Sequence, residues 1–79
     1  MNVLERVKNI IGEILKVESI VEKTNLIEEY SIDSLQAIEI LVMIENEFEI
    51  SIDDEDLNMR LLESPKVLCE YVEKKLGQL

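Results

Sequence analysis

The fold of this chain is decided by residues 33–48, which read DSLQAIEILVMIENEF. Asp33 is a favourable N-cap, because its carboxylate can accept the unpaired N–H groups of the residues that follow. Gln36, three residues later, completes the pattern of a capping box. The stretch therefore predicts one long helix over residues 34–48, with Ser34 at its first position.

Ser34 falls where unpaired N–H groups and the helix dipole favour negative charge. A phosphate ester on its hydroxyl would therefore be stabilised there. As a catalytic nucleophile Ser34 lacks an activating base, because the chain contains no histidine, and no lysine lies between positions 24 and 59. Ser34 is therefore either an ordinary helix-start serine or the acceptor of a modification made by another enzyme.

The apolar residues of the 34–48 helix form two neighbouring arcs. The first has the spacing of a core-facing stripe and comprises Ala37, Ile40, Leu41, Ile44 and Phe48. The second, bordered by Glu39, Glu45 and Asn46, comprises Leu35, Ile38 and Val42. A domain of this size rarely buries both arcs, so we expect the second to be partly exposed and to contact partners. The alternative is one wide stripe in a helix buried on two sides.

Length and charge limit the number of domains and the classes of partner that the chain can have. The 79 residues fit one domain over residues 1–79 with a modest core. The net charge is −10, and the segment between Thr24 and Met59 holds eleven acidic residues and no Lys or Arg. Such a surface repels nucleic acid and anionic membranes and attracts basic proteins, although a merely solvated face is the alternative. No membrane-spanning run or secretion signal is recognised, so neither nucleic acid nor membrane is an expected partner.

Residue types exclude most catalytic chemistry. Histidine is absent and Cys69 is the single cysteine, which excludes Ser-His-Asp catalysis, an internal disulfide and Cys-rich zinc sites. The acidic residues at positions 53–56 lack the spacing and the glycine of a calcium loop. We therefore predict a protein that is not an enzyme and has no specific metal site. Cys69 is expected to be reduced and packed, as suits a cytoplasmic location.

Three further helices are predicted, at residues 3–16, 54–61 and 65–76. The first has a strict three–four apolar spacing. The last begins after Ser64, a capping residue, and ends before Gly77. Together with the central helix they predict an all-α, four-helix bundle of three longer helices and one short helix.

The connections between these helices are less regular. Residues 17–32 are predicted to form a long first loop, with Val21 among its apolar anchors. Loops of this length are usually functional or contain a short helix of their own, and Thr24-Asn25 is a candidate start of a turn before residues 26–30. Ile50 and Ile52 alternate with polar residues as in a short strand, but a lone strand has no ladder partner, so an extended segment without a sheet is predicted. In the short helix that follows, Leu57 and Leu61 are expected to face inward.

Residues 26–35, LIEEYSIDSL, resemble the signature of the acyl carrier protein family, an acidic–apolar run followed by Leu-Gly-x-Asp-Ser-Leu. The resemblance extends over essentially residues 1–76. It implies that Ser34, preceded by Asp33 of the motif, carries a covalent 4′-phosphopantetheine arm that holds acyl intermediates as thioesters. Tyr30 and Ser31 replace the usual Leu-Gly, and Ser31 must do without the freedom of glycine at positive φ, so this loop is expected to differ slightly.

The resemblance also implies partners, namely a phosphopantetheinyl transferase and the acyl-loading and synthase enzymes, which would offer basic patches to the acidic helix. The positions expected at these contacts are Leu35, Ile38, Glu39, Val42, Glu45, Glu47 and Ile52. A discrete, monomeric carrier of fatty-acid, polyketide or related biosynthesis is expected. Two alternatives stay open: a stand-alone peptidyl or aminoacyl carrier, and an acidic helical interaction module that is never modified.

Overall fold

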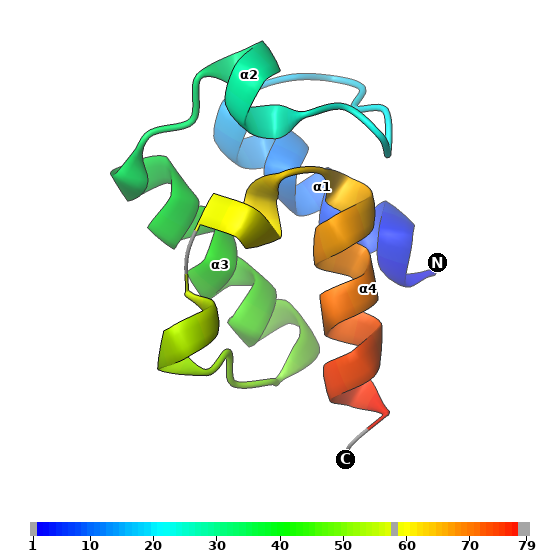
Figure 1. The fold of residues 1–79 in the computed structure, drawn as a ribbon. Coiled ribbons are helices and arrows are strands. Elements are labelled where there is room, and N and C mark those ends of the chain that lie inside the picture. The colour runs from blue at the N-terminus through cyan, green and yellow to red at the C-terminus, as the bar shows by residue number, and fades with distance from the viewer. Residues whose placement is uncertain (1, 58, 78–79) are drawn as a thin grey trace.

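The chain folds as a bundle of helices in the computed structural model, which describes residues 2–57 and 59–77 (Figure 1). Its elements are α1 (Val3–Leu15), α2 (Leu26–Tyr30), α3 (Ser34–Phe48), the 3₁₀ turns η1 (Asp54–Asp56) and η2 (Met59–Leu62), and α4 (Pro65–Leu76). No β-strand occurs among the described residues. The prediction of an all-α fold with three long helices is therefore confirmed.

The ends of the long helices follow from their caps. The predicted bounds of α3 and α4 are confirmed, and the side chains of Asp33 and Ser64 accept N–H groups in the first turns. Helix α1 ends one residue earlier than predicted, because Lys16 adopts the left-handed conformation with φ 59°.

The short helix lies elsewhere than predicted. The first loop contains α2, which begins after Asn25, and the Asn25 side chain accepts the N–H of Glu28 at 3.0 Å. The prediction of one helix at residues 54–61 is wrong, because Leu57 leaves the helical region with φ −77° and ψ 75°. Asn58, inside that predicted helix, lies outside the described residues.

Helix α1 packs against both α3 and α4, and η2 packs against α2, α3 and α4. Figure 1 shows α1 passing behind the start of α4, with α2 near the start of α3. The largest fully buried aliphatic side chains come from all four helices and η2, and are Val7, Ile11, Leu26, Ile40, Ile44, Leu62, Leu68 and Val72. The predicted core face of α3 is confirmed in full, since each of its residues is buried.

Three burial predictions are wrong. Ile52 is 5% exposed, so it packs in the core and does not belong to a contact surface. Val21 is exposed where the chain turns, with its carbonyl accepting the N–H of Thr24 at 3.0 Å, and it anchors nothing. Leu57 is exposed as well, because the chain leaves helical geometry at that residue.

Gly12, in the interior of α1, is explained by a close approach of the backbone. A Cβ atom at this position would lie 2.8 Å from the carbonyl oxygen of Val17. The chain turns back onto the helix there, and the N–H of Val17 donates to the carbonyl of Gly12 at 2.9 Å. A larger residue would therefore displace the start of the first loop.

Candidate functional site

Ser34 is the first residue of α3, and it is exposed. The capping role belongs to its neighbour Asp33, whose Oδ1 accepts the backbone N–H of Gln36 at 2.8 Å. The N–H of Asp33 in turn donates to Oε1 of Gln36 at 3.4 Å, which completes the predicted capping box. Since these residues satisfy the first turn, the Ser34 hydroxyl remains available at the positive end of a 15-residue helix.

The segment that leads to Ser34 is anchored on both sides of a turn. Leu26 and Ile32 are buried, and the N–H of Leu26 donates to the carbonyl of Glu63 at 3.0 Å. Between them Ser31 ends α2 with φ 50° and ψ 46° and donates its N–H to the carbonyl of Ile27 at 3.0 Å. A serine thus adopts the left-handed conformation that glycine adopts most easily, so the turn forms at some cost in free energy.

An apolar groove of about 380 Å³ starts at Ser34 and follows α3. One side is α3, and the other contains Leu57 and Met59. The lining residues are Ser34, Ala37, Ile38, Leu41, Val42, Glu45, Leu57 and Met59. Such a groove can bury an uncharged group that is attached at Ser34. The groove was not predicted from the sequence. The signal that could have indicated it is the pair of apolar residues Leu57 and Met59, which follow the acidic residues 53–56.

The second apolar arc of α3 is exposed, as predicted. Leu35 is 66% exposed, Ile38 58% and Val42 45%, and Glu39 beside them is exposed as well. Met43 extends this exposed surface, which the sequence analysis did not foresee. A helix face that combines exposed apolar side chains with a carboxylate is suited to contact another protein.

Two other predicted contact residues have partners within the chain. Glu45 Oε2 accepts the backbone N–H of Ile52 at 2.8 Å. Glu47 lies about 140° around the helix from Val42, given 3.6 residues per turn, and binds Arg6 of α1 with an Nη2–Oε2 distance of 2.6 Å. The Arg6 guanidinium also lies over the ring of Phe48, 4.4 Å from its centroid. Glu47 therefore does not share the face of the exposed arc.

The segment before η1 and η1 itself are tied to α4. Lys75 Nζ donates to Asp53 Oδ2 at 2.9 Å, and the Tyr71 hydroxyl donates to Asp56 Oδ2 at 3.0 Å. The hydrogen bond to Asp53 raises the pKa of Lys75. Burial, together with the hydrogen bond to Asp56, raises the pKa of Tyr71. These two contacts hold the chain immediately before Leu57, and so they support the second side of the groove.

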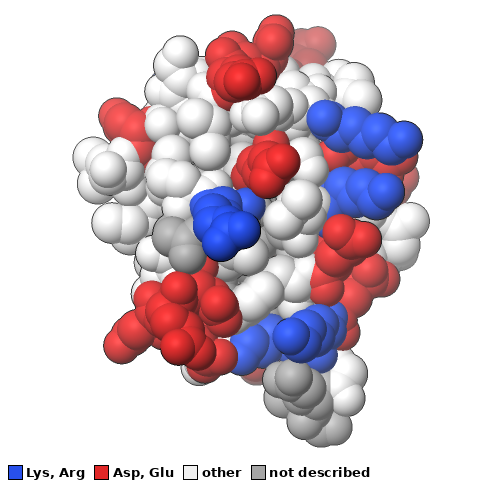
Figure 2. Space-filling view, in the orientation of Figure 1, with Lys and Arg blue, Asp and Glu red and all other residues white. Residues whose placement is uncertain are grey.

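Acidic side chains gather in separate groups on the surface. Figure 2 shows them where Figure 1 places α2 and η1. Among residues 2–57 and 59–77, no group of three or more His, Cys, Asp or Glu side chains is arranged to hold a metal ion. Within the same residues, no helix has the length and apolar character needed to span a membrane.

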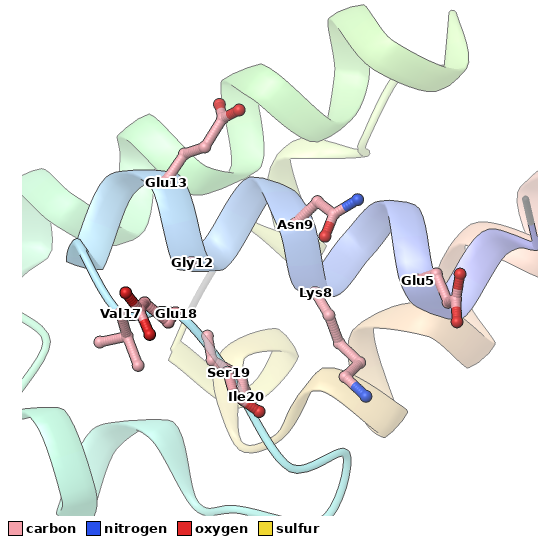
Figure 3. A pocket seen from close by; sticks show the side chains of 9 residues that line it. All are labelled: Glu5, Lys8, Asn9, Gly12, Glu13, Val17, Glu18, Ser19 and Ile20. Carbon is pink, nitrogen blue, oxygen red and sulfur yellow. The ribbon is translucent and has the colours of Figure 1, made fainter.

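A second hollow, of about 500 Å³, lies between α1 and the start of the first loop (Figure 3). Side chains of both charges belong to its lining, and Figure 3 shows Lys8 directed to the loop side of α1 and Glu13 directed to the opposite side. Cys69 is also remote in sequence from Ser34. Burial, followed by the charge and hydrogen bond of Glu73, raises the pKa of its thiol to about 11. None of the predicted site residues lines this hollow, and Cys69 is not one of them.

Comparison with known proteins gives a consistent result. Residues 5–72 match the family model described as "Phosphopantetheine attachment site". The chain is 37% identical over 76 residues to an acyl carrier protein of Buchnera aphidicola, covering 94% of each chain. It is 34% identical over 77 residues to an acyl carrier protein of Thermotoga maritima, covering 95% of this chain and 93% of the relative. A third acyl carrier protein, from Desulforapulum autotrophicum, is 32% identical over 78 residues, or 95% and 99% of the two chains.

Proposed function

The chain belongs to the acyl carrier protein family, and on that premise we propose that Ser34 is the residue to which its 4′-phosphopantetheine is covalently attached. One observation carries this proposal. Ser34 is exposed at the start of α3, while its neighbours Asp33 and Gln36 cap the helix. A phosphodiester at this hydroxyl would lie at the positive end of the helix dipole without displacing any capping group.

Attachment requires a separate transferase, because the chain offers Ser34 no activating base. In this step the Ser34 Oγ forms a new P–O bond with the pantetheine-linked phosphorus of coenzyme A. The pyrophosphate bond breaks, the adenosine bisphosphate half leaves, and the hydroxyl proton passes to a base of the transferase. Asp33 and Gln36 hold the helix start rigid during this step, which keeps the hydroxyl accessible.

When bound, the arm supplies a terminal thiol that holds an acyl group as a thioester. The chain contributes the groove beside Ser34, whose walls are mainly apolar. Apolar walls stabilise a hydrocarbon chain by removing it from water. We therefore favour the acyl intermediates of fatty-acid, polyketide or related biosynthesis over aminoacyl cargo, whose amino group would gain nothing there.

As in its family, the chain interacts with a phosphopantetheinyl transferase and with synthase enzymes. We propose that these enzymes cover the start of α3, with apolar contacts to Leu35, Ile38 and Val42. Basic patches on the enzymes would meet Glu39 and, at the edge of the groove, Glu45. Glu47 would contribute only by long-range attraction, because it binds Arg6. Ile52 is buried and has no place in this surface.

Acyl carrier proteins carry groups between enzymes rather than catalyse reactions. We propose the same for this chain, as a single monomeric domain that works in the cytoplasm. A reduced, buried cysteine agrees with that location.

Intact mass tests the proposal. The protein is incubated with coenzyme A, Mg²⁺ and a phosphopantetheinyl transferase of broad specificity. One phosphopantetheine should be added to wild type and none to Ser34→Ala. Ser31→Gly is a matched control, because it removes the other exposed hydroxyl of the segment and should leave loading intact. An unchanged wild-type mass with several competent transferases would favour an unmodified interaction module instead.

A further inference from the structure

The groove beside Ser34 has a charged residue at its far end. Glu45 lies eleven positions after Ser34 on α3, and both line the groove. At a rise of 1.5 Å per residue this separation is about 16 Å along the helix. Of the described residues that line the groove, Glu45 alone is ionisable. A chain that enters from Ser34 therefore meets apolar walls first and a carboxylate last.

The Glu45 carboxylate is held in place. Its Oε2 accepts the backbone N–H of Ile52 at 2.8 Å, and the side chain of Ile52 is buried. Glu45 itself is half-buried. A carboxylate with a fixed hydrogen bond moves less freely toward water than an exposed one, so its charge acts on whatever occupies the end of the groove.

We propose that Glu45 makes this groove selective for acyl chains whose distal end is uncharged. This inference rests on the proposed function, since the chain must be tethered at Ser34. A cargo with a terminal carboxylate would place a second negative charge beside Glu45 and would also lose its water on entry. Its distal end therefore stays in solvent, whereas an unsubstituted hydrocarbon chain of the same length enters the groove. Selectivity here comes from rejection of the wrong chain as much as from attraction of the right one.

The test compares three cargoes on the wild-type protein. A phosphopantetheinyl transferase attaches the acylated arm to Ser34 from the corresponding acyl-coenzyme A, with release of adenosine bisphosphate. The acyl group is octanoyl, an eight-carbon chain that ends in a carboxylate, or the methyl ester of that carboxylate. Intact mass first verifies loading. Thermal melting at neutral pH then measures insertion, because a group that binds only the folded state raises the melting temperature. We expect octanoyl and the methyl ester to raise it by several degrees relative to the unacylated arm, and the free carboxylate to leave it unchanged.

Glu45→Gln identifies the residue responsible. Its amide oxygen can still accept the N–H of Ile52, so the fold is retained while the charge is lost. The carboxylate-ended chain should now raise the melting temperature by at least half as much as octanoyl. Glu49→Gln is the matched control, because it removes one charge near the same end of α3 from an exposed residue that does not line the groove. It should leave the discrimination as in wild type.

The outcomes separate the two proposals. If no cargo is attached at Ser34, the proposed function fails. If loading succeeds but octanoyl and the carboxylate-ended chain shift melting equally in wild type, the selectivity is refuted. The role of Glu45 is also refuted if discrimination persists in Glu45→Gln or is lost equally in Glu49→Gln, since the latter result would indicate net charge alone.

Discussion

Lys75 of α4 donates a hydrogen bond to Asp53, with 2.9 Å between Nζ and Oδ2, and so joins the last helix to the segment before η1. Four residues away on the same helix, Tyr71 binds Asp56. Lys75 also lies 5.7 Å from the centroid of the Tyr71 ring. Two side chains of α4 thus restrain the part of the chain that leads into one side of the groove.

Removing the two hydrogen bonds from α4, Lys75–Asp53 and Tyr71–Asp56, should increase local opening of η1 without unfolding the bundle. In the double variant Lys75→Met, Tyr71→Phe, we expect faster amide exchange at Asp56 and Leu57, whose N–H groups donate to carbonyls of residues 53 and 54. The amides of α1 should be unaffected, because that helix is buried against α3 and α4. Hydrogen exchange followed by NMR provides the measurement. If amide exchange accelerates equally in α1 and η1, the two hydrogen bonds stabilise the whole fold and not η1 alone.

The two arcs of α3 should respond differently to the same substitution. Ile44 is fully buried, so Ile44→Asp should unfold the domain, because an unpaired buried carboxylate costs several kcal/mol. Val42 is 45% exposed, and we expect Val42→Asp to lower the free energy of unfolding by only about 1 kcal/mol. Circular dichroism with urea denaturation gives both values. If Val42→Asp is as damaging as Ile44→Asp, the exposed arc belongs to the core after all.

The long helices could be predicted from the sequence, because their capping residues and their apolar spacing agree with the burial that the structure shows. The Asp33–Gln36 capping box and the three–four spacing of α3 specify that helix by local chemistry. The break at Leu57 was not predicted from local signals, and the residues just before it, Asp53 and Asp56, bind side chains of α4 that lie far away in the sequence. The burial of Ile52 likewise depends on tertiary packing.

Part of the candidate site could likewise be predicted from local sequence, and part of it depends on tertiary packing. The position of Ser34 followed from the capping pattern alone. The groove required knowledge of which segment faces α3, and no periodicity in residues 54–61 provides that. Glu45 was predicted as a contact residue from its place beside the exposed arc, but its hydrogen bond to Ile52 arises from the turn after α3.

Ser31→Gly should stabilise the protein. Ser31 adopts φ 50°, and the left-handed conformation costs an L-residue about 1–2 kcal/mol that glycine avoids. The greater entropy of glycine in the unfolded chain offsets about 0.4–1 kcal/mol of this, so the net gain should be about 1 kcal/mol and at most about 1.6 kcal/mol. Urea denaturation measures it. Ser51→Gly is the control, because Ser51 is exposed without a positive φ, and it should give no gain.

Glu39→Lys should slow loading of the arm by a transferase mainly through the association rate. Glu39 is exposed beside Leu35 and Val42, so reversing its charge weakens attraction to a basic partner without disturbing the fold. The difference from wild type should shrink as salt is raised, because screening removes the attraction. Stopped-flow binding at two ionic strengths separates association from dissociation. An effect confined to the dissociation rate would argue against steering.

Cys69 should make the fold sensitive to alkaline pH. Burial, then Glu73, raises the pKa of the folded thiol from 9.0 to about 11. The folded state therefore keeps the thiol proton at pH values where the unfolded state has lost it. The resulting stabilisation is complete below pH 9 and is lost as the pH rises toward 11, a change of about 2–3 kcal/mol for two pKa units.

Cys69→Ala isolates this effect, because the other alkaline groups of the chain, including Tyr71 and Lys75, titrate in both proteins. Urea denaturation at pH 8.0 and at pH 10.5 should show that wild type loses about 2 kcal/mol more of its free energy of unfolding than the variant between the two pH values.

A protonated, buried thiol is also a poor nucleophile, so Cys69 should not compete for a thioester carried on the arm. Loaded protein at neutral pH should therefore show no transfer of the acyl group to Cys69 by peptide mass analysis. Equal pH dependence in the two proteins, or acylation of Cys69, would show that the thiol is neither buried nor protonated as the fold requires.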